Sequence, residues 1–393
     1  MNNQYRKVYL DHAATTPVRT EVLEEMMPYF QEFFANPMSV HHFGQKSAEA
    51  VDLARGRATK LLAGSTTDEI IFTSGATESN NLAIYGICFA NSDYGKHIIT
   101  SRIEHHAVLE VCHHLEKLGY EVTYLPVDCC GLVNPDDVRK SLRKDTILVS
   151  VMHANNEIGS IQPIEEISRV VKENSKAYFH TDAVQSVGYL DVDINKMGVD
   201  LLSISAHKFY GPKGVGALYV RKGTKINPFI RGGGQEGGVR PGTHNVPGIV
   251  GLGKAAELVI TDKLKESSRV LSLRDKLNSG IEKGIEDVIF NGHPLQRLPN
   301  NANFAFLGID GEALLTAISE QGIYVSTGSA CSSGEVEPSH VLLGIGIKPE
   351  FARGSLRFSL GRMTNEEDIE YTLLILEKEV RRLREISPLR RRV

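Results

Sequence analysis

Short apolar segments alternate with amphipathic segments between residues 68 and 221, and this alternation constrains the fold more than any other feature of the sequence. Repeated strand–helix–strand units predict a largely parallel sheet with helices on both faces. In such a sheet, ligands bind at the carboxyl ends of the strands. The seven strands that we predict cover residues 70–72, 97–100, 122–127, 147–152, 177–180, 201–204 and 215–220.

The pattern changes after residue 244, where residues 245–284 predict one long, mostly helical connector. Beyond it we predict a smaller α+β unit whose last helix begins with a capping box of Thr364 and Glu367. With 393 residues, the chain is long enough for two domains. We predict a large domain over residues 16–257 and a small domain formed by residues 1–15 and 258–393. The further elements expected in the small domain are strands 302–307, 323–326 and 355–360 and helix 311–321.

Composition is ordinary for a soluble globular protein, with 41% hydrophobic and 23% charged residues. The net charge of −4 carries no overall signature of nucleic-acid or membrane-surface binding. No apolar run approaches the ~18 residues of a membrane span, and the polar N-terminus lacks the core of a signal peptide. We therefore expect neither nucleic acid nor membrane as a partner. Arginines crowd the C-terminus, which is typical of a solvated helix face and leaves open a docking surface for an acidic partner.

The five cysteines are odd in number and none forms a CxxC pair, so the sequence indicates neither a disulfide framework nor a zinc site. A reducing cytoplasm is the compartment that we expect. Cys112 shares an apolar helix face with its neighbours and is expected in the core. The adjacent Cys129 and Cys130 follow a strand and are expected in a turn.

Three segments that follow predicted strands carry candidate cofactor chemistry. The first, Phe-Thr-Ser-Gly-Ala-Thr-Glu at residues 72–78, leads from a strand into a helix. The backbone N–H of Ala76 and the hydroxyl of Thr77 at this helix start suit a phosphate, although an ordinary helix cap would use the same residue types. The second segment contains Asp182, whose carboxylate could pair with a protonated ring nitrogen or cap a helix. Pairing with a ring nitrogen maintains the electron sink that a pyridoxal cofactor needs.

The third segment is Ser-Ala-His-Lys at residues 205–208, directly after a strand and before a glycine-rich turn. Ser205 and His207 can donate to a phosphate while Lys208 reaches an aldehyde. Desolvation and a nearby cation would lower the pKa of the Lys208 amine and expose a nucleophile. For this segment alone, a structural lysine is a serious alternative. The three segments together favour a pyridoxal phosphate site.

These motifs resemble the class V aminotransferase-type pyridoxal-phosphate enzymes and, more narrowly, the cysteine desulfurases of the NifS/IscS type. The similarity extends from about residue 8 to residue 388. Further matching segments are Asn-Asn-Glu-Ile-Gly at 155–159, Arg-Pro-Gly-Thr at 240–243, Gly-Ser-Ala-Cys at 328–331 and Leu-Arg-Phe-Ser at 356–359.

The resemblance implies a fold type I pyridoxal-phosphate-dependent transferase, an α/β protein whose large domain contains a mostly parallel seven-stranded sheet. It also implies a homodimer with active sites shared between subunits. Lys208 would hold the cofactor as a Schiff base, Asp182 and Gln185 would bind the ring, and His105 would stack on the ring and act as acid and base. The phosphate would be held by Ala76, Thr77, Ser205 and His207, with Thr243 from the neighbouring subunit. Asn156 would contact cofactor and substrate, and Arg357 would grip the substrate carboxylate.

The implied reaction is that of a cysteine desulfurase, a sulfurtransferase that converts L-cysteine to L-alanine. Cys331 would capture the sulfur as a persulfide and pass it to acceptor proteins for iron–sulfur cluster assembly or other thiolation. The length of the segment after Cys331 resembles that of the subgroup that delivers sulfur to a scaffold protein. No permanent metal site is expected, although Cys331 could ligate an iron–sulfur cluster transiently.

Two other classes of function compete with this interpretation. A transaminase or a selenocysteine lyase would use the same cofactor, but a transaminase has no need of Cys331. A catalytically inactive sulfur-trafficking protein would not need Lys208, Asp182 and His105 together. Preference for cysteine over selenocysteine is left open by the sequence.

Overall fold

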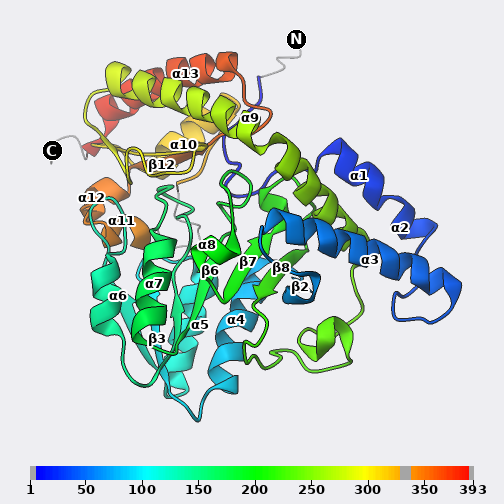
Figure 1. Cartoon of the computed structure of the whole chain (residues 1–393). Helices are drawn as coiled ribbons and strands as arrows, with labels where there is room; N and C mark the ends of the chain where they lie inside the picture. The colour runs from blue at the N-terminus through cyan, green and yellow to red at the C-terminus, as the bar shows by residue number, and fades with distance from the viewer. Residues whose placement is uncertain (1–5, 328–337, 389–393) are drawn as a thin grey trace.

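A seven-stranded sheet forms the centre of the larger part of the molecule (Figure 1). The computed structural model describes residues 6–327 and 338–388. The strand order is β2-β8-β7-β6-β5-β3-β4, and of these seven strands only β8 runs against the others. The prediction of a mostly parallel sheet is therefore confirmed. The strands are β2 Ile70–Thr73, β3 His97–Ser101, β4 Glu121–Leu125, β5 Thr146–Ser150, β6 Tyr178–Asp182, β7 Leu201–Ser205 and β8 Gly216–Val220.

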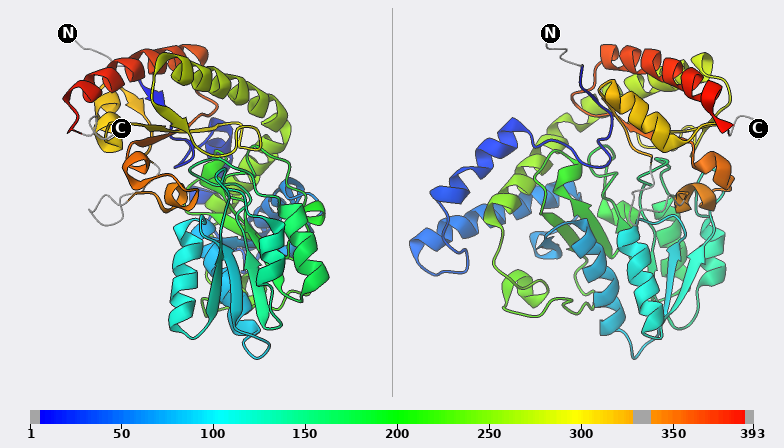
Figure 2. Two further views of the ribbon diagram at one scale, coloured as in Figure 1. Left: turned by 90° about the vertical axis from the view of Figure 1, so that its left-hand side faces the viewer. Right: turned by 180° about the vertical axis from the view of Figure 1, so that it is seen from behind.

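Helices cover both faces of this sheet, as the edge-on view in Figure 2 shows. The central strands are continuous apolar and β-branched runs with every residue buried in β5 and β7, which is the pattern of a sheet covered on both sides. On one face lie α4 Ala76–Ala90 and α5 His106–Lys117, where Cys112 is buried as predicted. The other face is covered by α3 His42–Leu61, α6 Pro135–Ser141, α7 Ile164–Asn174, α8 Ile194–Met197 and the first half of α9 Val246–Gly284, with α1 Thr20–Met26 and α2 Pro28–Gln31 beside them.

A second hydrophobic core lies beyond the carboxyl ends of the strands and contains the aromatic side chains of Phe304, Phe306 and Phe358. The N-terminal strand joins this core, because β1 Val8–Tyr9 pairs in parallel with β11 Ile323–Tyr324. The sequence pattern missed β9, a three-residue strand. The remaining elements are β9 Val288–Phe290, β10 Asn301–Phe306, β12 Ser355–Ser359, α10 Gly311–Glu320, α11 His340–Gly344, α12 Pro349–Ala352 and α13 Glu366–Ile386.

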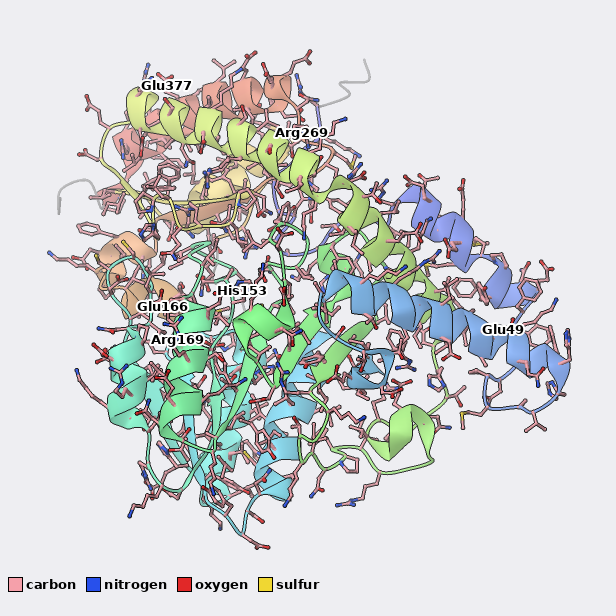
Figure 3. The ribbon with its side chains drawn as sticks, viewed as in Figure 1. Glu49, His153, Glu166, Arg169, Arg269 and Glu377 are labelled. Atoms are coloured by element: carbon pink, nitrogen blue, oxygen red, sulfur yellow. The ribbon has the colours of Figure 1, made fainter. Side chains whose placement is uncertain are left out.

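Helix α9 connects the two cores. Its buried residues up to Val259 belong to the core against the sheet, and those from Val270 to Ile281 belong to the second core. Arg269, labelled on α9 in Figure 3, donates hydrogen bonds to the carbonyl oxygens of Gly361 (2.9 Å) and Thr364 (2.6 Å). The predicted domain boundary at residues 257/258 falls inside this helix and stays a prediction.

The predicted capping box of α13 is wrong by one residue. Asn365 is the N-cap, and its side chain and that of Asp368 bond reciprocally to the two backbone N–H groups. The Thr364 hydroxyl instead accepts a hydrogen bond from the N–H of Gly361 and closes the preceding turn. Cys129 and Cys130 lie in a turn, as predicted. No helix in the described ranges, 6–327 and 338–388, is long and apolar enough to cross a bilayer.

The contact between α3 and α9 yields a stability test, because Gly253 lies directly against Ala54. A Cβ at Gly253 would lie 2.6 Å from the Ala54 Cα, whereas a Cβ at Gly56 on α3 would meet nothing within 4 Å. Gly253→Ala should therefore lower the thermal unfolding midpoint, since overpacking costs about 1–3 kcal/mol. The matched control Gly56→Ala should raise it, because alanine is favoured over glycine in a helix by about 1 kcal/mol. Calorimetry of both variants checks the prediction, and a stabilised Gly253→Ala would contradict it.

Candidate functional site

A cavity of about 450 Å³ opens at the carboxyl ends of the parallel strands. His153, labelled in Figure 3, follows β5 at this edge of the sheet and donates its backbone N–H to the carbonyl oxygen of Asp182 (2.8 Å). The structure thus brings together most of the residues that sequence reasoning proposed for the site. The cavity is lined by Ala76, Thr77, His105, Asn156, Asp182, Gln185, Ser205, His207 and Lys208, together with Thr15, Asn80, Met152 and others.

One end of the cavity is suited to an anion. Helix α4 begins after Gly75, which has a φ of +150° and provides no side-chain cap, so the first N–H groups of the helix remain available. The absence of a side chain at Gly216 permits this turn to approach β8, because a Cβ there would lie 2.8 Å from the Gly75 Cα. Ser205 and Thr77 bring hydroxyl groups to the same end.

His207 at this end is neutral at physiological pH. Burial, and next the charge of Lys208, lower the pKa of His207 to about 4. Its Nδ1 lies 3.1 Å from the Thr15 hydroxyl oxygen. His207 therefore contributes hydrogen bonding rather than charge at the anion-binding end.

The opposite end of the cavity contains the carboxylate of Asp182, which is 6% exposed. Its Oδ2 accepts a hydrogen bond from Asn80 Nδ2 (2.7 Å), and its Oδ1 accepts one from the N–H of Val184 (3.0 Å). Sequence reasoning missed Asn80, although its position one turn after Ala76 places it on the same side of α4. The Asn80 Oδ1 is buried and has no hydrogen-bond partner among the described atoms.

His105 is the N-cap of α5, and its Nδ1 accepts the N–H of Ala107 (3.0 Å). In the neutral ring the proton therefore lies on Nε2, and burial lowers the pKa of this histidine. The preceding Glu104 is buried, and its Oε1 accepts from the Ser101 hydroxyl (2.6 Å) and the Met152 N–H (3.0 Å). Burial raises the pKa of Glu104 to about 8. Glu104 thus fastens the loop that carries His105 to the ends of β3 and β5.

The amine of Lys208 lies between the two ends of the cavity, in a single turn at Ala206–Lys208 that follows β7. Its Nζ donates to the carbonyl oxygens of Ala13 (2.6 Å) and Ala14 (2.7 Å), and Gln185 Nε2 donates to the same Ala13 oxygen (3.0 Å). Burial, followed by the nearby charge of Arg357, lowers the pKa of Lys208 to about 8. The N-terminal segment, residues 11–15, thus lies directly against the predicted nucleophile.

Arg357 lies on β12 of the second core and does not line the cavity itself. Its Nη2 donates to Asp11 Oδ1 (2.8 Å) and its Nη1 to the carbonyl oxygen of Asn156 (3.0 Å). Arg357 and Asn156, both predicted to bind substrate, are therefore in contact. Asp11 is a further residue of the site that sequence reasoning did not single out.

Two contacts, one buried and one partly buried, fasten the start of α11 next to the cavity. The Ser339 hydroxyl donates to Glu157 Oε2 (2.5 Å), and burial raises the pKa of Glu157 to about 7. His340 Nε2 lies 2.9 Å from the carbonyl oxygen of Glu104. The chain that follows Cys331 therefore returns beside the segments that carry His105 and Asn156. Cys331 itself lies outside the described residues.

Thr243 is placed away from the other predicted residues. It is exposed and does not line the cavity of its own chain. It follows Gly242, which has a φ of +107° and whose N–H donates to the Gln235 side chain (3.0 Å). The structure therefore does not bring Thr243 together with the other residues predicted to hold a phosphate.

The residues present fit pyridoxal phosphate. The start of α4 with Ser205 and His207 can hold a phosphate, and the buried carboxylate of Asp182 can pair with a protonated ring nitrogen. Between them, Lys208 presents an amine whose pKa is lowered enough for nucleophilic attack near neutral pH. The unpartnered oxygen of Asn80 adds a polar atom at the ring end.

The lowered pKa of Lys208 can be tested by pulse acylation of the cofactor-free protein. Labelling of the peptide that contains Lys208, followed by mass spectrometry, should show a midpoint near pH 8, and Arg357→Gln should raise this midpoint because it removes a neighbouring cation. A midpoint near the ordinary lysine value of about 10.4 would contradict the burial argument. Since the folded pKa lies below the unfolded one, Lys208 should also make the protein more stable as the pH rises from about 8 towards that unfolded value.

Comparisons with known proteins agree with the geometry of the site. The model of the class V aminotransferase family matches residues 8–372. The chain is 59% identical over 383 residues to the cysteine desulfurase IscS of Dictyoglomus turgidum, covering 98% of this chain and 97% of the relative. It is 55% identical over 390 residues to the cysteine desulfurase IscS of Methanosarcina thermophila, covering 99% and 96%.

Solved structures give the same result. A NifS-like protein that is 40% identical superposes with a TM-score of 0.91, covering 96% of this chain and 100% of that protein. SspA in complex with cysteine, also 40% identical, superposes with a TM-score of 0.81, covering 90% and 99%. The chain therefore belongs to the class V aminotransferase family of pyridoxal-phosphate enzymes and, within it, to the cysteine desulfurases of the NifS/IscS type.

Proposed function

We propose that this protein converts L-cysteine to L-alanine and captures the sulfur as a persulfide on Cys331. The observation that carries the proposal is the Lys208 amine, which lies half-buried between an anion-binding helix start and the carboxylate of Asp182. Arg357 and Asn156 lie beside this amine and suit an amino-acid carboxylate. The cysteine desulfurase names of the relatives and the cysteine complex of SspA support the choice of substrate.

The residues of the chain divide the chemistry between them. When bound, pyridoxal phosphate withdraws electrons from the α-carbon of an amino acid. Arg357 orients the substrate carboxylate, and the Lys208 amine, partly uncharged near pH 8, takes up the α-proton. His105 carries a proton on Nε2 that it can donate to, or regain from, reacting groups in the cavity.

Cys331 supplies the second nucleophile. Its thiolate attacks the substrate sulfur, so that a sulfur–sulfur bond forms as the carbon–sulfur bond breaks. The electron pair of the broken bond stays with the β-carbon, which takes up a proton, and alanine leaves. A free thiol is only about 10% ionised near pH 7.5, so a neighbouring base is needed. His105 is the candidate, and it can accept the thiol proton at Nδ1 once that atom releases the hydrogen bond from the Ala107 N–H, because Nε2 already carries a proton. The outer sulfur of the persulfide is then transferred to an acceptor protein.

We propose an iron–sulfur scaffold or another thiolated protein as the acceptor, working in a reducing compartment such as the cytoplasm, where Cys331 stays a free thiol. The IscS names of the relatives support this class of acceptor. The arginines of α13 favour a solvated helix face over a docking surface. Arg381 and Arg382 pair with Glu377 and Glu379, and Arg384 donates to the carbonyl oxygen of Leu307.

The central test compares the wild type with Lys208→Ala and Cys331→Ser, all loaded with pyridoxal phosphate. The wild type should release alanine and sulfide from L-cysteine in the presence of a thiol reductant. Cys331→Ser should retain the visible absorption of the bound cofactor and lose sulfide release by at least about 100-fold, because the acceptor thiol is missing. Lys208→Ala should lose that absorption band as well as turnover.

Three outcomes would count against the proposed reaction. Unchanged turnover in Cys331→Ser would remove this thiol from the mechanism. A wild type that stays colourless after reconstitution would remove the cofactor. Activity on L-selenocysteine but not on L-cysteine would assign the protein to the selenocysteine lyases instead.

We further propose a homodimer in which Thr243 reaches the phosphate site of the partner subunit. Thr243 is exposed and lies outside the cavity of its own chain. The segment that carries it is held in place by Glu236, which is buried and pairs with Arg55 (2.7 Å) and His244 (2.8 Å). Large apolar side chains near this region are exposed, and such patches commonly mark subunit interfaces. They include Met38, which lines a pocket together with Gln235 and Glu236, and Phe229 and Ile230 of the same chain segment.

Subunit mixing tests the shared site. Heterodimers of Lys208→Ala with Thr243→Ala should contain roughly one wild-type site each if Thr243 acts across the interface, because both changes then fall in the same site. Turnover of the mixture after subunit exchange should exceed the mean of the two parent homodimers. Turnover equal to that mean would place Thr243 in the site of its own subunit or outside the reaction.

A further inference from the structure

Arg357, which we propose binds the substrate carboxylate, is already paired with a carboxylate of this chain, that of Asp11. Asp11 Oδ1 accepts from Arg357 Nη2 at 2.8 Å, and the two side chains are 21% and 6% exposed. Asp11 belongs to the N-terminal segment, whose next residues, Ala13 and Ala14, accept the hydrogen bonds of Lys208. The pair is thus part of the immediate surroundings of the reactive amine.

The remaining donors of Arg357 show what else the guanidinium can bind. Nη1 donates to the carbonyl oxygen of Asn156 (3.0 Å), and Nε is buried without a partner among the described residues. A guanidinium offers five N–H donors, and two of its edges suit a carboxylate. Arg357 therefore has donor capacity left for a second carboxylate, which would lie close to the negative charge of Asp11.

We propose that Asp11 tunes the affinity of the site for its substrate by competing with the substrate carboxylate for Arg357. Before substrate binds, Asp11 holds the guanidinium in place and balances its charge. When an amino acid binds, its carboxylate takes up donors of Arg357 and is repelled by Asp11, so that affinity for the carboxylate is held below what Arg357 alone would give. This inference rests on the proposed function, in which Arg357 grips the substrate carboxylate.

If Asp11 only positions Arg357, replacement of Asp11 should change the affinity for substrate in the opposite direction. If Asp11 only held Arg357 in its conformation, weakening the pair would loosen the guanidinium and weaken substrate binding. If Asp11 competes, removal of its charge should tighten carboxylate binding, because a like charge close to the site has been removed. Asp11→Asn separates the two cases, since asparagine has the same shape and can still accept a hydrogen bond from Arg357.

The experiment measures binding of L-alanine, which has no sulfur to transfer, and of L-alaninamide, which lacks the carboxylate. Calorimetric titration of the holoenzyme should show that Asp11→Asn lowers the dissociation constant of L-alanine roughly three- to tenfold, as expected for removing one partly screened like charge. The dissociation constant of L-alaninamide should not fall. Asp11→Glu, which keeps the charge, should not tighten binding of L-alanine.

Two further variants make the result unambiguous: a control at a different ion pair, Asp262→Asn, and a variant of the residue that Asp11 pairs with, Arg357→Lys. Asp262→Asn removes a carboxylate from a distant pair with Arg19 and Arg362 and should leave both dissociation constants unchanged. An unchanged or raised dissociation constant of L-alanine in Asp11→Asn would overturn the competition. If Arg357→Lys binds L-alanine as well as the wild type does, the proposed carboxylate role of Arg357 has failed. If Arg357→Lys weakens binding while Asp11→Asn has no effect, only the inference about Asp11 has failed.

Discussion

The hydrogen bonds from the Lys208 ammonium to the carbonyl oxygens of Ala13 and Ala14 join two parts of the molecule that have separate hydrophobic cores. Lys208 follows a strand of the large sheet, whereas the N-terminal segment continues from β1, which pairs within the second core. Burial of an ammonium is costly unless hydrogen bonds compensate it, so the lysine requires this segment to be in place. The site is therefore complete only where both cores meet.

Charge in the cavity is balanced by short-range pairs. The positive charges of Lys208 and Arg357 face the carboxylates of Asp11 and Asp182. Burial lowers the pKa of His207 at the anion-binding end and raises the pKa of Glu104, the residue before His105. Both shifts favour the uncharged form of the side chain. The charged side chains are therefore the ones that we expect to bind or react. The supporting side chains of His207 and Glu104 form hydrogen bonds without adding charge.

Much of the fold could be predicted from the sequence, because the central strands of a doubly covered sheet are short, mostly apolar runs. The three-residue strand β9 is too short to give a pattern. The capping box was misplaced because Thr364 with Glu367 and Asn365 with Asp368 have the same spacing, and only the turn bonded through the Thr364 hydroxyl decides between them.

In the site, residues that follow strands were found because parallel strands deliver them to one edge. The contacts of Asn80 with Asp182 and of Asp11 with Arg357 span 102 and 346 positions of the chain. No local spacing in the sequence records such contacts, so tertiary structure was needed to find them. The same holds for Thr243, whose exposure and distance from the cavity appear only in the folded chain.

Helix α9 has 39 residues and is about 58 Å long at 1.5 Å per residue. One end of α9 packs against the sheet and the other end packs against β10 and α13. Unfolding of either core would therefore expose the apolar side chains on one half of this continuous helix to water. The free-energy cost of that exposure falls on both cores at once. Two units joined by a flexible linker can unfold in separate steps, but two units that share a helix are expected to lose structure in one cooperative transition.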